Sequence, residues 1–500
     1  MATVYDFVII GSGASGSVLA HYLSEAGAKC LLLEAGKQWD KTNYPRNELH
    51  TNSRLFWGGG MDATTNANLL FLRGKLFGGG TVVNQALLDR FDDLALDEWR
   101  DISGVDAYSV DNMERHYDAI EEHLQIHTIE REEWNRNAEL YAEGFDKLGY
   151  KWSKLRRGQS DCQVDKNDCM ACLGGCRRDS KQSMPITFLK KAQANGLEIK
   201  TEFEVSDIAH GPQQVAIHGQ RHGVHETVYG RKCIVAAGTL GTNRLLLTSG
   251  YKERLPALGE GFFAHPQWMN LAMFDEEINA HKGALQAIKS DEPRFRKQGF
   301  KLENVFVGPM GVTMLIPAHG IELQNYMERY RYMASMEVCI RDVIPGTIRV
   351  NGKGRLQITK PLNGEDLKRG MAGVKVVKQI YDSLGAREFI TSNFNFSLHQ
   401  MGGCAIGENA DKSVVNHSYQ VHGHENLIIA DGSIFPSAPG INPSLTIMAN
   451  SHRASEIILK EFGASISETV SESTDSKSSA TSVLGKSIKT NVNKKEKARG

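Results

Sequence analysis

A chain of 500 residues is too long for one compact core, and its length predicts two or three domains. Its 58 lysines and arginines nearly balance its 59 aspartates and glutamates, which excludes a strong electrostatic attraction to nucleic acid. No apolar run is long enough to span a membrane, and no signal peptide precedes the first predicted strand, so we expect a cytoplasmic protein.

The start of the chain has the pattern of a dinucleotide-binding unit. Phe7–Ile10 is a short apolar run, typical of a buried parallel strand. A helical pattern and a second apolar strand follow, and that strand ends at Glu34. The first turn contains three glycines that allow a tight turn, backbone approach to a pyrophosphate and close helix packing, namely Gly11, Gly13 and Gly16. An acid after the second strand suits ribose hydroxyls, so the sequence predicts a bound dinucleotide, either FAD or NAD.

Two glycine-rich blocks and two amphipathic helices come next. Residues 56–60 and 74–84 each contain three consecutive glycines, which let the backbone approach a flat ligand. A helix is predicted over 109–124 because four apolar residues share one face, Met113, Tyr117, Ile120 and Leu124. Another helix is predicted over 139–148, ended by Gly149.

Four of the eight cysteines lie in one short window, with the spacing C-x6-C-x2-C-x3-C. They are Cys162, Cys169, Cys172 and Cys176. This clustering favours a metal or redox role over a disulfide framework. The last three resemble part of an iron–sulfur spacing, so an iron–sulfur cluster is one prediction. A zinc site, disulfides and free thiols stay open as alternatives.

The second half of the chain changes in character twice. Residues 231–237 predict a buried strand, followed by a helix over 242–248. From about residue 266 the pattern is a strand over 337–341, a hairpin around Asn351-Gly352 and a long helix over 366–384. Four apolar residues recur at helical spacing along that helix, namely Leu367, Met371, Val374 and Leu384. Strands with a covering helix predict an α+β substrate domain.

The chain ends in one more strand, a helix and a polar tail. Residues 427–432 predict a buried strand that ends in an acid, and Asn442-Pro443 opens a helix that runs to about Phe462. Residues 464–500 have too little apolar mass to fold, so we expect a disordered tail.

Five blocks in a fixed order resemble the glucose–methanol–choline (GMC) family of flavin oxidoreductases. They are residues 74–84, residues 238–250, residues 258–266, residues 399–404 with 421–423, and residues 430–433 with 440–443. The resemblance covers nearly all of 5–462 and implies that the dinucleotide is FAD. Within the family, the chain most resembles the sterol-oxidase-like and long-chain-alcohol-oxidase-like members. Those members carry a cysteine-rich insert before a Lys-x-Ser segment, which is Lys181 to Leu189 in this chain.

The resemblance implies a fold with two parts. One is an α/β FAD-binding Rossmann-type domain, discontinuous in sequence and built from residues 1–95, 190–265 and 395–463. The other is an α+β substrate-binding domain with an antiparallel sheet, built from residues 96–189 and 266–394, with the cysteine-rich insert at 162–176.

The implied reaction is oxidation of an alcohol CH–OH group to a carbonyl, with hydride transfer to flavin N5. His399 holds the family's catalytic position and is predicted to take the hydroxyl proton, which a neutral imidazole can do. Asn442 is predicted to bond the substrate oxygen, and it also suits the N-cap of the last helix. The alternative is an FAD-containing lyase of the same family with no net redox chemistry. A non-catalytic flavoprotein is disfavoured because His399 and Asn442 are both present.

The predicted FAD-binding residues combine the sequence pattern with the resemblance. They are Gly11, Gly13, Ala14, Gly16, Glu34, Gly78, Gly79, Thr81, Asn84, Val205, Asp431 and Asn442. Some family members link FAD covalently through a histidine at the position of Val83, so the valine predicts non-covalent FAD. The expected partners are a small-molecule alcohol and an electron acceptor, for which oxygen, a quinone or a cytochrome would each fit. We expect no nucleic acid and no transmembrane segment.

Overall fold

The computed structural model describes residues 3–163, 172–211 and 213–461. The chain divides into two compact units, residues 1–455 and 456–500. Of the second unit, residues 456–461 are described and are helical. The predicted tail, residues 464–500, lies outside the described residues. All sheets and the site belong to the first unit.

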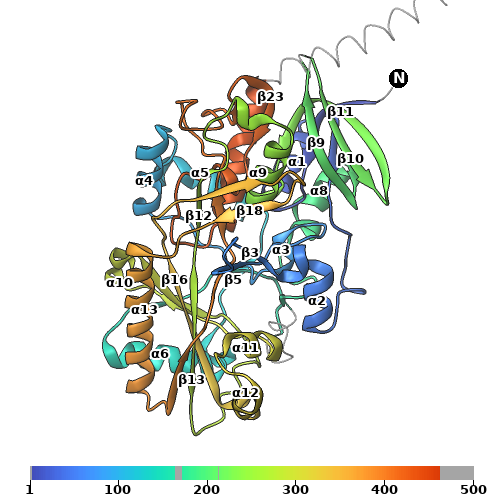
Figure 1. Ribbon diagram of the computed structural model, residues 1–500. Coiled ribbons are helices and arrows are strands. Elements are labelled where there is room, and N and C mark those ends of the chain that lie inside the picture. Colours follow the sequence, from blue (N-terminus) through green and yellow to red (C-terminus); the bar gives the residue numbers. More distant parts are fainter. Residues whose placement is uncertain (1–2, 164–171, 212, 462–500) are drawn as a thin grey trace, which may run out of the picture. The chain divides into compact units, whose positions relative to one another are not determined.

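The first sheet has eight strands in the order β22-β23-β11-β1-β2-β8, with β10 and β9 continuing from β11 (Figure 1). Pairs β1–β2, β1–β11, β2–β8 and β11–β23 are parallel, whereas β9, β10 and β11 form an antiparallel ribbon. The strands are β1 (Val4–Ile10), β2 (Cys30–Leu33), β8 (Glu198–Lys200), β9 (Phe203–His210), β10 (Val215–Arg221), β11 (Val224–Val235), β22 (Gln420–Val421) and β23 (His424–Ile429). This parallel core confirms the predicted Rossmann-type fold.

The predicted strand, glycine turn, helix and second strand are present at the start of the chain. Helix α1 (Ala14–Glu25) follows β1 through Gly11, whose φ is +103°. A Cβ at Gly11 would lie 2.3 Å from the Ala236 carbonyl oxygen, and one at Gly16 would lie 2.0 Å from the Gly11 carbonyl oxygen. Glycine is therefore needed at both positions for α1 to pack this closely on the sheet.

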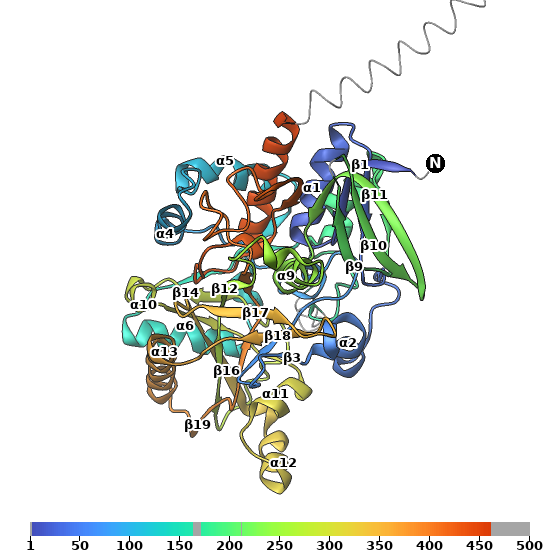
Figure 2. The ribbon, with the colours of Figure 1, turned by 45° about the horizontal axis from the view of Figure 1, so that its top comes forward.

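The second sheet has nine strands in the order β3-β4-β20-β13-β16-β15-β14-β6, with β19 also paired to β13. Its pairs are antiparallel except β4–β20. The strands are β3 (Asp62–Ala63), β4 (Leu69–Phe71), β6 (Trp152–Lys154), β13 (Gln267–Met273), β14 (Ile288–Ser290), β15 (Phe300–Asn304), β16 (Met333–Ile340), β19 (Glu388–Thr391) and β20 (Asn395–Ser397). Helices α6 (Arg136–Leu148) and α13 (Gly364–Ser383) pack on one face of this sheet (Figures 1 and 2). The predicted antiparallel sheet with a covering helix is confirmed.

The helix predicted over 366–384 is confirmed as α13, and two of its four spaced apolar residues, Val374 and Leu384, pack against the core. Leu367 and Met371 are 44% and 43% exposed. The buried face instead carries Gly370, Gly373, Val377, Ile380 and Tyr381, together with Asp366. A Cβ at Gly370 would lie 2.5 Å from the Trp268 ring, and one at Gly373 would lie 2.3 Å from the Val338 side chain. The two glycines let the helix approach the sheet, so the helix turns its smallest residues to the core.

A four-stranded sheet in the order β18-β17-β12-β21 contains the predicted hairpin. Its strands are β12 (Glu260–Ala264), β17 (Gly346–Val350), β18 (Leu356–Thr359) and β21 (Gln400–Gly402). The turn differs from the tight Asn-Gly turn that the sequence predicted. The Asn351 side-chain oxygen accepts from the backbone N–H groups of Lys353 and Arg355, and Gly354 has the positive φ of +68°. The loop is therefore longer, with Asn351 closing it. A further pair is β5 (Ile126–His127) with β7 (Arg157–Gly158).

The two helices predicted between the glycine-rich blocks and the cysteines are confirmed. Helix α5 (Val110–Glu121) is capped by Ser109, and α6 ends at Gly149 with a φ of +68°. The other helices are α2 (Glu48–Leu55), α3 (Gly80–Val83), α4 (Asp93–Ser103), α8 (Phe188–Ala194), α9 (Gly238–Thr248), α10 (Pro293–Gln298), α11 (Pro309–Leu315) and α12 (Gly320–Glu328). Residues 444–455 are also helical. Among the described helices, none is both long and apolar enough to cross a membrane.

The strands of the eight-stranded sheet all fall in the three segments predicted for the FAD-binding domain. Strands β3, β4 and β20 also fall in those segments but pair in the nine-stranded sheet. The predicted FAD-binding segments therefore contribute strands to more than one sheet, and the predicted domain boundaries stay a prediction.

Candidate active site

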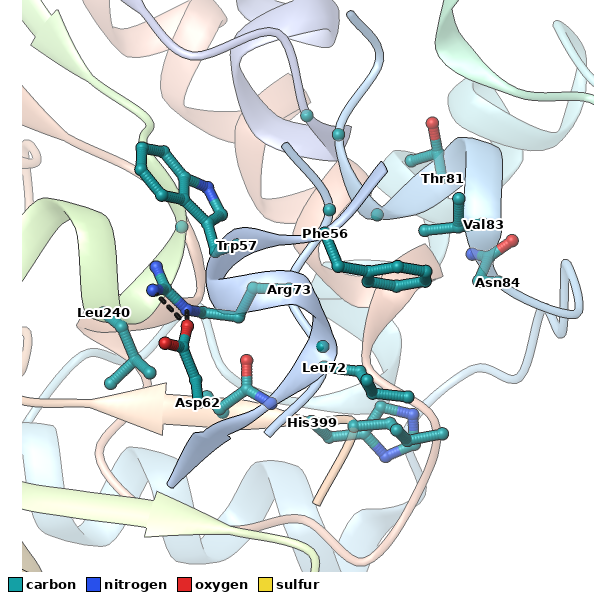
Figure 3. A pocket seen from close by; sticks show the side chains of 18 of the residues that line it. Phe56, Trp57, Asp62, Leu72, Arg73, Thr81, Val83, Asn84, Leu240 and His399 are labelled. Atoms are coloured by element: carbon teal, nitrogen blue, oxygen red, sulfur yellow. Dashed lines mark hydrogen bonds and ion pairs between the residues drawn. The ribbon is translucent and has the colours of Figure 1, made fainter. Parts of the chain in front are cut away.

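A cavity of about 1590 Å³ extends from the glycine turn after β1 to the strands β13, β15 and β16 (Figure 3). This volume exceeds the roughly 300–1,000 Å³ of a typical small-ligand pocket. Figure 3 shows Thr81 and Val83 of α3, with Asn84 directly after it, on one side of Phe56, and Leu72 and His399 on the other side. The cavity therefore has room for a dinucleotide and for a second, smaller molecule beside it.

The N-terminus of α1 forms one wall of the cavity. Its N-cap is Gly13, which has no side chain to bond the first N–H groups of the helix. A Cβ built on Gly13 meets no protein atom within 4 Å, although Gly13 lines the cavity. Helix N–H groups without a capping side chain and open space above Gly13 fit a bound pyrophosphate.

Glu34 lies at the end of β2, on the cavity wall. Its carboxylate accepts from the Ser12 N–H at 3.0 Å, the Ser12 hydroxyl at 2.6 Å and the Gly36 N–H at 2.7 Å. Burial raises the pKa of Glu34, against the lowering effect of these hydrogen bonds. The Ser12 hydroxyl also accepts from the Gly78 N–H at 2.8 Å, which ties the second glycine-rich block to the first turn. These bonds fix Glu34 on the cavity wall, and its contact with a ribose stays a prediction.

Most of the predicted cofactor residues come together on the cavity wall. Those that line it are Gly11, Gly13, Ala14, Glu34, Gly79, Thr81, Asn84, Val205, Asp431 and Asn442. Gly16 and Gly78 are not among the lining residues and act through backbone packing instead.

Asp431 has a structural task that the sequence did not predict. Its two carboxylate oxygens accept from Gly238 N–H, Thr242 hydroxyl, Ser433 N–H and Ser433 hydroxyl, at 2.5–2.9 Å. These bonds fix the end of β23 to the start of α9. Burial raises the pKa of Asp431 despite these donors. Its contact with a cofactor stays a prediction.

His399 and Asn442 both line the cavity. Burial, followed by the charge of Lys301, lowers the pKa of His399 to about 3, so the ring is neutral at ordinary pH. The Asn442 side-chain oxygen accepts from the Lys301 ammonium, which leaves its NH₂ group as the donor for the cavity. The predicted N-cap role is not what the structure shows, because the helix begins at residue 444 and Lys301 occupies the amide oxygen.

Three charged residues on the cavity side of the nine-stranded sheet were missed by the sequence analysis. Glu303 on β15 lies opposite Glu337 on β16, and Lys301 lies opposite Cys339. The Lys301 ammonium bonds the Glu303 carboxylate at 2.5 Å. We call Lys301, Glu303 and Glu337 the polar floor. The signal that could have found them is alternation, since residues 301 and 303 share one strand face while Leu302 faces the core.

The polar floor is stabilised by neighbouring amides. Gln286 donates to Glu303 at 3.0 Å, and Gln267 donates to Glu337 at 3.4 Å. Burial and the neighbouring Glu303 raise the pKa of Glu337 well above its usual value. Burial alone would lower the pKa of Lys301, but Glu303 and other negative neighbours raise it overall. The raised pKa of Glu337 favours its protonated form, and the raised pKa of Lys301 favours a charged lysine beside it.

The cysteine window is only partly described, because Cys169 lies outside the described residues. Cys172 is buried, and its thiol accepts from the Gln159 amide at 3.5 Å. The buried Lys181 ammonium donates to the carbonyl oxygens of Val82, Asn84 and Cys172 at 2.5–2.8 Å. Lys181 thus joins the cysteine segment to α3 of the cavity wall. The iron–sulfur cluster stays a prediction.

Comparison with known proteins agrees with this geometry. Family models described as GMC oxidoreductase match residues 5–267 and 351–451. An uncharacterized GMC-type oxidoreductase of Sinorhizobium fredii is 28% identical, with 91% of this chain and 94% of the relative covered. A long-chain-alcohol oxidase of Arabidopsis thaliana is 26% identical, with 91% and 67% covered.

Solved structures share the fold. Pyridoxine 4-oxidase from Mesorbium loti superposes with a TM-score of 0.72 at 17% identity, covering 90% of this chain and 98% of the other. Formate oxidase of Aspergillus oryzae has a TM-score of 0.73 at 14% identity, covering 93% and 99%. The family models, the parallel sheet and the glycine-lined cavity agree, and the chain therefore belongs to the GMC oxidoreductase family of FAD-dependent oxidoreductases.

Proposed function

We propose that this chain oxidises an alcohol CH–OH group to a carbonyl with non-covalently bound FAD. The observation that supports this most directly is that one cavity joins the glycine-lined dinucleotide wall to His399 and Asn442. Bound FAD supplies a ring that accepts a hydride at N5. Gly13 and the α1 N-terminus would hold its pyrophosphate, and Glu34 its ribose.

His399 and Asn442 hold the alcohol oxygen in this proposal. Lys301 orients the Asn442 amide so that its NH₂ group is available to that oxygen. His399 is neutral, and a neutral imidazole either accepts a proton through a bare nitrogen or donates through an N–H. Whether His399 accepts the hydroxyl proton or donates a hydrogen bond to the alcohol oxygen depends on which of its two ring nitrogens carries the proton.

The substrate is proposed to be an alcohol with an apolar body. The same cavity is lined by the apolar side chains of Met269, Val305, Phe306, Met314, Leu315 and Leu398. One relative is named a long-chain-alcohol oxidase, which supports the same class. Polar groups that hold the hydroxyl and apolar side chains in the same cavity match such a molecule.

A series of primary alcohols of increasing length tests this substrate class. Mixed anaerobically with the holoenzyme, longer alcohols should bind more tightly, by about fourfold per added methylene at ~0.8 kcal/mol each, until the apolar part of the cavity is filled. The measurement is the alcohol concentration that gives half-maximal flavin bleaching. Equal values for ethanol and a long-chain alcohol would contradict the apolar substrate class.

We expect FAD to leave the protein on denaturation. Val83 lines the cavity on α3, in Figure 3 beside Asn84, and an alkyl side chain cannot form the covalent link that a histidine forms. Acid precipitation followed by centrifugation should leave the yellow colour in the supernatant. Colour that stays in the washed pellet would show a covalent bond.

The cysteine window is proposed to hold an iron–sulfur cluster. Leu173 and Gly174 of this segment line the cavity, which places the segment beside the dinucleotide wall. Iron analysis of protein made anaerobically should find iron in the wild type, and Cys176→Ser should remove it while FAD stays bound. Cys233→Ser, which lies in β11 away from the window, is the control and should keep its iron. A wild type without iron would retire the cluster.

A further inference from the structure

His265 makes a contact with His399 that the sequence did not reveal. It is fully buried between β12 and β13. Its Nδ1 lies 3.0 Å from the Nδ1 of His399, and the two rings meet edge to face at 87°. Its Nε2 lies 2.9 Å from the backbone nitrogen of Gly440. The ring of His265 is therefore hydrogen-bonded through both nitrogens.

The proton positions in this chain follow from one fixed donor. The Gly440 N–H can only donate, so the His265 Nε2 must accept and carries no proton. Burial, with His399 and Lys301 nearby, lowers the pKa of His265 well below its usual value, so the ring is neutral. A neutral ring without a proton on Nε2 carries it on Nδ1. That N–H points at the Nδ1 of His399, which therefore accepts.

We propose that His265 is a positioning residue that fixes the tautomer of His399, so that resting His399 turns an Nε2–H donor, and no bare nitrogen, toward the alcohol oxygen. This inference rests on the proposed function and deepens it. The Nδ1 of His399 is used by His265, and the neutral ring has its single proton on Nε2. Since the ring lines the cavity, this N–H is what a bound alcohol meets.

Both groups at the alcohol oxygen are then donors. The Asn442 side-chain oxygen already accepts from Lys301, so its NH₂ group is the part that can bond the alcohol. In the same way, the Nδ1 of His399 already accepts from His265, so its Nε2–H is the part that can bond the alcohol. Two donors stabilise the negative charge that develops on the oxygen as its proton leaves. The expectation that His399 itself takes the proton does not agree with this arrangement.

The hydroxyl proton then needs a separate acceptor in the same cavity. The polar floor supplies one, because Lys301 bonds both Asn442 and Glu303 and so places the Glu303 carboxylate beside the site. The hydride leaves the alcohol carbon for FAD, the proton leaves its oxygen for the Glu303–Glu337 pair, and the C=O bond forms.

Nitrogen NMR of the holoenzyme tests the tautomer without any turnover. With ¹⁵N-labelled histidine, and with the His399 signals assigned by their loss in His399→Gln, wild-type His399 should show a protonated Nε2 and a bare Nδ1. In His265→Leu, which removes the donor, signals of both tautomers should appear. A wild-type His399 with a protonated Nδ1 would overturn the proposal. Because FAD is not reduced in this measurement, its outcome is separate from that of the proposed function.

A kinetic comparison tests the acceptor. Glu303→Gln keeps the size of the side chain but cannot take a proton, and it should slow flavin reduction by about 10²–10⁴-fold. His265→Leu should slow flavin reduction by at least about tenfold, because His399 is no longer held in one tautomer. A tenfold slower rate corresponds to an activation free energy higher by roughly 1.4 kcal/mol. His265→Gln, which restores an N–H donor, should recover part of that loss. Glu322→Gln, on α12, is the control and should reduce as the wild type does. A wild-type rate in Glu303→Gln would show that the proton goes elsewhere.

Discussion

Replacing His399 by alanine should slow the reduction of bound FAD by an alcohol about 10²–10³-fold, the size expected when a donor to a developing oxyanion is removed. FAD content should stay that of the wild type, because the predicted pyrophosphate and ribose contacts are made by other residues, Gly13 and Glu34. Anaerobic stopped-flow absorbance with one alcohol that reduces the wild type measures the rate.

The matched control is His417→Ala, an exposed histidine that bonds Glu408. It should reduce its flavin at the wild-type rate. The pH profile gives a second check, since the pKa of His399 is lowered to about 3 by burial and Lys301. The ring stays neutral above that value, so its titration should not change the rate between about pH 5 and 8. Flavin reduction in His399→Ala as fast as in the wild type would remove His399 from the site.

Gly13→Ala should weaken FAD binding about 10–100-fold while the protein still folds. The φ of Gly13 is −71°, which alanine adopts without strain, and its Cβ would meet no protein atom within 4 Å. The methyl group would instead occupy the space that a pyrophosphate needs next to the backbone. Losing close N–H bonds to a charged group costs about 1.5–3 kcal/mol, or about a 10–100-fold weaker affinity.

Gly352→Ala is the control for this variant. Its Cβ also meets nothing within 4 Å and its φ is not in the left-handed region, but it does not line the cavity. Gly352→Ala should bind FAD as tightly as the wild type does. Without FAD, Gly352→Ala and Gly13→Ala should have the same melting temperature. Equal FAD affinity in both variants would show that the pyrophosphate does not pass over Gly13.

Local sequence patterns predicted the parts of the fold that depend on local interactions. The β1–α1 turn follows from its own glycines, and the caps of α5 and α6 follow from Ser109 and Gly149. The buried face of α13 did not follow, because it is set by the contacts of Gly370 and Gly373 with strands that are distant in sequence. The turn at Asn351 differed because the side-chain oxygen closes a longer loop.

The site shows the same division between local and distant information. His399 and Asn442 stand in recognisable blocks, and both line the cavity. Lys301 and Glu303 stand in no such block. They are brought to the site by the register of β15 against β16 and by the contact of Lys301 with Asn442. The contact of His265 with His399 joins residues 134 positions apart. Such pairings are created by the fold and leave no periodic signal in the chain.

Removal of a hydride from an alcohol carbon by this chain can be followed in a single turnover without oxygen. The holoenzyme is mixed with a long-chain primary alcohol, and flavin absorbance and carbonyl product are measured together. We expect one carbonyl for each flavin bleached, and slower bleaching when the carbinol carbon carries deuterium. No bleaching of the flavin and no carbonyl product, as a lyase without net redox chemistry would give with this alcohol, would contradict this expectation.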